Sequence, residues 1–145
     1  MFSSSTQLGN RRPSATAYRE VGASTALDGA SPHKLVSLLY SALASQLAGA
    51  RGALARSDVP AKARAIAHAV RIVEEGLRMP LDRQGGGAIA TNLNDLYEYI
   101  VHRLTLANLR NDDDALRECA QLVETLREGW DGMAEQPEAA SRAAA

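Results

Sequence analysis

The strongest helix start in the chain is the stretch Ala30-Ser31-Pro32-His33-Lys34-Leu35-Val36-Ser37-Leu38-Leu39-Tyr40. Ser31 is suited to cap a helix, because its hydroxyl can accept a hydrogen bond from a free backbone N–H. Pro32 fits the first helical position, where its missing N–H removes no hydrogen bond. Apolar residues then recur at helical spacing, at Leu35, Leu38, Leu39, Ala42, Leu43, Leu47, Ala50 and Leu54. The stretch predicts a long amphipathic helix that ends near Arg56.

The same spacing predicts three further helices. The first spans residues 60–79, with Asp58 as its cap and Pro80 as its stop, because a residue before proline avoids helical geometry. Its apolar seam is Ile66, Val70, Val73 and Leu77. The second spans 88–109, with the seam Ile89, Leu93, Leu96, Ile100, Leu104 and Ala107. The third spans 115–133 behind an aspartate cap, with the seam Leu116, Cys119, Val123, Leu126, Trp130 and Met133.

Composition and loop lengths set the fold class. The chain has 145 residues, of which 46% are hydrophobic and only 4% aromatic, and no alternating pattern indicates a strand. Four helices joined by short loops favour antiparallel neighbours. We therefore predict an all-α, antiparallel up-down four-helix bundle over residues 30–133, with a short N-terminal segment packed on it. Residues 1–29 are predicted to be a flexible segment that could form a short capping helix, and 134–145 a disordered tail.

Charge and patterning exclude several classes of partner and location. The formal net charge is -1, from 16 basic and 17 acidic residues, whereas nucleic-acid binding requires a basic surface. No stretch approaches the ~20 apolar residues of a membrane-spanning helix, and the start does not resemble a signal peptide. The one cysteine cannot form an internal disulfide. We expect a cytoplasmic protein with no nucleic-acid partner and no membrane insertion.

No combination of residues supports catalysis. His33, His68 and His102 have no metal-ligand spacing with one another or with Cys119. The three glycines at 85–87 follow no strand and precede no Lys-Ser or Lys-Thr pair, so a flexible connection fits them better than a phosphate loop. The sequence predicts no enzyme, no cofactor and no metal.

Apolar residues remain on two helices after the seams are assigned. They are Tyr40, Leu43 and Leu47 in the first helix, and Tyr97, Tyr99, Val101 and Leu106 in the third. A helix that is apolar over more than one stripe has a further surface to cover. These residues indicate a groove for a partner helix, and the alternative is that they complete the core.

Several stretches, taken in order, resemble the FliS family of flagellin-specific export chaperones. The matching pieces are Ala17-Tyr18, 30–40, Asp58, Lys62, 72–77, Leu81-Asp82, Gly85-Gly86, Ile89-Ala90, Asn92-Leu93, 96–99, Arg103-Leu104, Ala107-Asn108, Asn111-Asp112 and Trp130. The resemblance implies a chaperone that binds the disordered C-terminal segment of flagellin about one-to-one. It also implies that binding prevents premature polymerisation and that the complex is delivered to the flagellar export apparatus.

The resemblance also implies that the N-terminal segment covers part of the client groove, with Tyr18 as its plug. For the groove we predict Tyr18, Tyr40, Leu43, Leu47, Tyr97, Ile100, Val101 and Leu104, with Arg103 and Asn108 as polar positioning residues. Two alternatives stay open, a histidine phosphotransfer bundle and a generic helical adaptor. An uncovered groove would also allow weak self-association without client.

Overall fold

The computed structural model describes residues 29–82 and 84–133, and in these ranges it contains helices and no strand. The elements are α4 (Pro32–Ala55), α5 (Val59–Arg71), the π-helix η1 (Ile72–Arg78), α6 (Gly87–Arg110) and α7 (Asp113–Gly132). The prediction of an all-α four-helix bundle is confirmed. The predicted N-terminal segment with Tyr18 and the predicted tail at 134–145 lie outside the described residues.

Three short polar side chains begin helices, as the sequence predicts. The Ser31 hydroxyl accepts a hydrogen bond from the backbone N–H of Lys34 at 3.1 Å. Asp58 caps α5 through the N–H of Ala61, also at 3.1 Å. Asp112 caps α7, which therefore begins two residues earlier than the predicted position 115.

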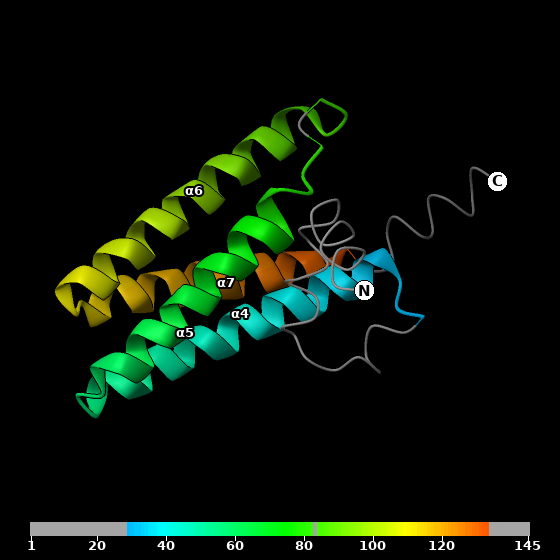
Figure 1. Ribbon diagram of the computed structural model, residues 1–145. Coiled ribbons are helices and arrows are strands. Elements are labelled where there is room, and N and C mark those ends of the chain that lie inside the picture. Colours follow the sequence, from blue (N-terminus) through cyan, green and yellow to red (C-terminus); the bar gives the residue numbers. More distant parts are fainter. Residues whose placement is uncertain (1–28, 83, 134–145) are drawn as a thin grey trace, which may run out of the picture.

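The four helices form a closed ring of neighbours (Figure 1). α4 packs against both α5 and α7, and α6 packs against α7 on one side and against α5 and η1 on the other. Successive helices run in opposite directions. Each helix therefore contacts two neighbours and buries a stripe wider than a single seam.

The core-facing line of α6 differs from the predicted seam. Ile89, its first predicted member, is 73% exposed, and the buried residues at this end are Ala90, Asn94 and Tyr97. Ile100, Leu104 and Ala107 are buried as predicted. The sequence prediction placed Leu93 and Leu96 in the seam because leucine is more apolar. Asn94 and Tyr97 are buried instead because each finds a hydrogen-bond partner on another helix.

The predicted helix at 60–79 is continuous but changes its winding. At residue 72 it becomes the π-helix η1, and the N–H of Met79 donates to the carbonyl of Glu74 five residues earlier at 2.9 Å. A π-helix inside an α-helix is rare and is often found at a functional site. Gly76 and Leu77 of η1 are both buried, and both reach the pocket described below.

Two glycines before and at the start of α6 are required by geometry. A Cβ on Gly86 would lie 2.7 Å from the Ala90 Cβ and 2.7 Å from the Asp82 carbonyl oxygen. Gly87 has a φ of 59°, in the left-handed region that glycine adopts without strain. The triple glycine is thus a tight connection between η1 and α6.

A buried lysine secures the opposite end of the bundle. Lys62 of α5 is only 2% exposed, and its ammonium donates to the carbonyl of Asn108 at 2.8 Å and to the side chain of Asn111. The last carbonyls of a helix have no partner within it, so Lys62 satisfies one of these groups for α6. This contact holds α5 against the α6–α7 turn.

Candidate functional site

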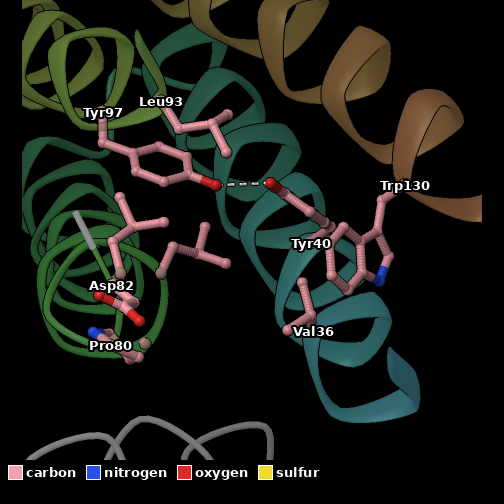
Figure 2. A pocket seen from close by; sticks show the side chains of 10 residues that line it. Val36, Tyr40, Pro80, Asp82, Leu93, Tyr97 and Trp130 are labelled. Atoms are coloured by element: carbon pink, nitrogen blue, oxygen red, sulfur yellow. Dashed lines mark hydrogen bonds between the residues drawn. The ribbon is translucent and has the colours of Figure 1, made fainter. Parts of the chain in front are cut away.

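An apolar pocket of about 210 Å³ lies at the end of the bundle where α4 and α6 begin and η1 and α7 end. The helices α4, η1, α6 and α7 all contribute residues to it (Figure 2). Its lining residues are Val36, Tyr40, Gly76, Leu77, Pro80, Leu81, Asp82, Leu93, Tyr97 and Trp130. We call this space the central pocket.

Two tyrosines on diagonally opposed helices meet at the central pocket. The hydroxyls of Tyr40 on α4 and Tyr97 on α6 form a hydrogen bond of 2.6 Å, and each residue is 3% exposed (Figure 2). Burial raises the pKa of both hydroxyls, because an anionic phenolate is poorly solvated there. The pair thus stays protonated at neutral pH and gives the apolar site one polar feature.

Arg78 at the end of η1 fastens this side of the pocket to α6. Its guanidinium donates to the Asn94 side chain at 2.9 Å, to Glu74 at 3.1 Å and to Glu98. Asn94 is buried, so its oxygen would lack this partner if η1 moved away. The network therefore fixes the η1 wall of the central pocket relative to Tyr97.

Four of the predicted groove residues lie in the core and leave no surface for a partner. Leu43, Leu47, Ile100 and Leu104 are between 0% and 1% exposed. A groove role at the surface is wrong for these four, because each helix packs against two neighbours and needs a broad apolar face. Leu43 and Leu47 instead complete the core, which was the alternative, and Ile100 and Leu104 hold the seam positions also predicted for them. Tyr40 and Tyr97 differ from them, since both line the central pocket.

The other predicted residues lie elsewhere. Val101, Arg103 and Asn108 are half-buried and do not line the central pocket. The Arg103 guanidinium donates to Glu118 at 2.6 Å, and the Tyr99 hydroxyl donates to the same carboxylate at 2.7 Å. These two bonds hold the pKa of Glu118 below its ordinary value. Tyr18 lies outside the described residues.

Sequence reasoning missed most of the pocket wall. Trp130 and Leu77 were assigned to core seams, and Val36, Pro80 and Leu81 to no site at all. The signal that could have found them was the resemblance to FliS, because every lining residue except Pro80 lies in a stretch that resembles the family. Hydropathy alone cannot separate a pocket residue from a core residue, since both are apolar.

The chemistry of the central pocket is that of a binding site. Among the described residues that line the pocket, Asp82 is the one acidic or basic side chain beside apolar and tyrosine side chains. Across 29–82 and 84–133, no three His, Cys, Asp or Glu side chains cluster in a way that could hold a metal ion. Cys119 is fully buried on α7, and burial raises the pKa of its thiol to about 12. The arrangement suits an apolar side chain of a partner.

Comparison with known proteins identifies the family. The model of a family described as "Flagellar protein FliS" matches residues 14–137. The chain belongs to the FliS family. It is 43% identical over 114 residues to the "Flagellar secretion chaperone FliS" of Salmonella typhimurium, which covers 79% of this chain and 84% of the relative. It is 40% identical over 116 residues to "Flagellar secretion chaperone FliSB" of Pseudomonas aeruginosa, covering 80% and 91%.

A more distant relative, "Flagellar secretion chaperone FliS" of Vibrio cholerae, is 32% identical over 120 residues, covering 83% of this chain and 88% of the relative. The FliS match contains all the described helices and every residue of the central pocket. The resemblance seen in the sequence is therefore confirmed at the level of the family. No helix in the described part of the chain has the length and apolar character needed to cross a bilayer.

Proposed function

We propose that this chain is a cytoplasmic secretion chaperone that binds the C-terminal segment of flagellin, prevents its premature polymerisation and assists its export. The observation that carries the proposal is the central pocket, an apolar site built from all four helices of a FliS-family bundle. Relatives named flagellar secretion chaperones support a client protein as the partner.

The properties of the pocket suit a client that folds on binding. A disordered segment loses conformational entropy when it becomes helical, so it needs apolar anchors that stabilise the bound form. The central pocket offers such an anchor point, with aliphatic walls at Val36, Leu77 and Leu93 and a tyrosine pair beneath. A large apolar side chain of the client helix fills the pocket, and the rest of the client extends over neighbouring helices.

The predicted site residues take different parts in this proposal. Tyr40 and Tyr97 contact the client, whereas the four core residues Leu43, Leu47, Ile100 and Leu104 act by holding the helices in place. Val101, Arg103 and Asn108 lie along α6 and are proposed to contact client residues beyond the pocket. We further propose that the N-terminal segment with Tyr18, which lies outside the described residues, covers part of the client groove when no client is bound. The flagellar export apparatus is proposed to receive the loaded chaperone. Weak self-association of the free protein stays a prediction.

The alternative of histidine phosphotransfer has one feature in its favour. His68 and His102 are exposed, as a phosphoacceptor must be. A FliS-family match over 14–137 favours the chaperone instead. Phosphorylation of either histidine by a partner kinase would be the observation that revives the alternative.

A charge placed in the pocket wall tests the proposal. Leu93 lines the central pocket, and Leu109 lies on the same helix but is 76% exposed at its other end. Fluorescence anisotropy of a labelled flagellin C-terminal segment would measure binding to the native chain, to Leu93→Glu and to Leu109→Glu. We expect Leu93→Glu to weaken binding at least about tenfold, because a carboxylate would lose water on contact with an apolar anchor. Leu109→Glu should bind like the native chain.

Circular dichroism would establish that both variants retain the helical fold. Equal affinity of folded Leu93→Glu and the native chain would contradict the assignment of the central pocket as the client site. Failure of the native chain to bind the segment would reject the proposed function itself.

A further inference from the structure

The start of α4 and the end of α7 are joined by a reciprocal pair of hydrogen bonds. The His33 ring nitrogen Nε2 lies 2.9 Å from the Trp130 carbonyl oxygen, and the Trp130 indole N–H donates to the His33 carbonyl at 3.0 Å. A carbonyl oxygen only accepts, so Nε2 must carry the hydrogen and donate it. The two rings also stack, with centroids 4.8 Å apart and an interplanar angle of 11°. We call these contacts the His33–Trp130 clasp.

The clasped indole lies between two apolar spaces. Trp130 and Val36 line the central pocket, and the same two residues line a second pocket of about 240 Å³ together with Pro32, His33 and Met133. Figure 2 shows the indole beside Val36 and Tyr40, at the edge of the central pocket. The position of this one ring therefore decides the shape of both pockets.

Apart from the clasp, the indole is held by partial packing against the core. The last fully buried residue of α7 is Val123, and the two turns that follow bury no side chain completely. Helix ends fray when their side chains are not packed. Beyond the clasp, the Ser37 hydroxyl donates to Asp131 at 3.1 Å, but this contact is exposed. Without the His33 side chain the indole would lose its stacking partner, and the end of α7 would lose the bond from Nε2, so the indole would keep only its core packing and its bond to the backbone carbonyl of residue 33.

We propose that His33 is a positioning residue for the client. Through the clasp it holds Trp130 as the wall shared by the two pockets, so the client meets a preformed site. His33 is not among the residues that line the central pocket, so it acts there through Trp130 rather than by contact. This inference rests on the proposed function, because it concerns the affinity of the same site.

The test uses the fluorescence of Trp130, which is the only tryptophan of the chain. His33→Ala removes both the ring stack and the hydrogen bond from Nε2, whereas His33→Phe keeps a stacking ring. Lys34→Ala is the matched control, since Lys34 is the exposed neighbour on the same turn. In the full chain without client, His33→Ala should move the emission to longer wavelength, as expected for an indole released to water.

Client affinity is the second readout. In His33→Ala, we take the clasp to be lost in about nine molecules of ten. The share of molecules with the preformed site then falls about tenfold, and the affinity for the flagellin C-terminal segment falls by the same factor. His33→Phe should restore the affinity part of the way, and Lys34→Ala should bind like the native chain. A merely structural role would lower the unfolding midpoint of His33→Ala without changing the emission or the affinity of the folded protein.

Native-like affinity in His33→Ala, or an unchanged emission, would overturn the inference while leaving the proposed function intact. Failure of the native chain to bind the segment would instead reject the proposed function and the client role of His33 together. The two failures are thus distinguished by the native chain alone.

Discussion

The hydroxyl pair at the central pocket gives the sharpest test of the structure. Tyr40 and Tyr97 hydrogen bond to each other at 2.6 Å, and both side chains are almost fully buried. Tyr40→Phe removes one hydroxyl and leaves that of Tyr97 without its protein partner, and Tyr97→Phe does the reverse. The double variant removes both hydroxyls and leaves an apolar contact in their place.

Losing one hydroxyl of the pair lowers the free energy of unfolding more than expected from its hydrogen bond alone, because the other hydroxyl is left without a partner. Leaving one buried polar group unsatisfied costs about 1–3 kcal/mol, whereas replacing both partners by apolar groups is nearly neutral. Both tyrosines line the central pocket, so water can reach the remaining hydroxyl and the cost should lie near the lower limit. We expect each single variant to lose about 1 kcal/mol, and the double variant to lose no more than one single variant.

Urea unfolding followed by Trp130 emission and circular dichroism measures these differences. A loss of about 1 kcal/mol lowers the midpoint by roughly 0.5 M urea if the slope is near 2 kcal/mol per molar. Tyr99→Phe is the control, because the Tyr99 hydroxyl donates to Glu118 on the exposed surface and its loss should cost less than about 0.5 kcal/mol. Additive losses in the double variant would contradict this expectation, since they would mean that the two hydroxyls do not depend on each other.

Three further predictions concern buried groups. Lys62→Met should destabilise the fold by about 1–3 kcal/mol, because it leaves an α6 carbonyl without a donor, and Arg64→Met, an exposed neighbour, should have little effect in the same urea assay. Cys119 should resist iodoacetamide at pH 8 in the native chain and react after unfolding, because its thiol is buried and its pKa is raised to about 12; equal rates would contradict its burial. The pKa of Tyr40 and of Tyr97 is raised by burial, so their contribution to stability is complete below pH ~10 and is lost as the pH rises further. Ultraviolet titration of tyrosinate should therefore show that Tyr40 and Tyr97 ionise only as the protein unfolds at alkaline pH. Ionisation of both tyrosines with no loss of helix would contradict this prediction.

The sequence predicts the helices well because their signals are local. Ser31, Asp58 and Asp112 each cap a helix through a hydrogen bond to a nearby N–H, and this depends only on the residues beside them. The burial of Cys119 in α7 also follows from its spacing relative to Leu116 and Val123. These features require no knowledge of what the helix packs against.

Features that depend on a partner from another helix are missed. Hydropathy ranks Ile89 above Asn94 for the core, but Asn94 is buried because Arg78 reaches it from η1. The burial of Lys62 depends in the same way on the end of α6. The π-helical winding of η1 left no pattern in its apolar spacing, so the shape of the pocket could not be predicted.

Binding of a flagellin C-terminal segment to an apolar site is the property proposed for this FliS-family bundle. Calorimetric titration of the full chain with that segment, at several temperatures, tests it most directly. We expect binding close to one-to-one with a clearly negative heat-capacity change, the signature of a disordered client that folds onto apolar surface. No binding to a complete C-terminal segment from the same organism would contradict it.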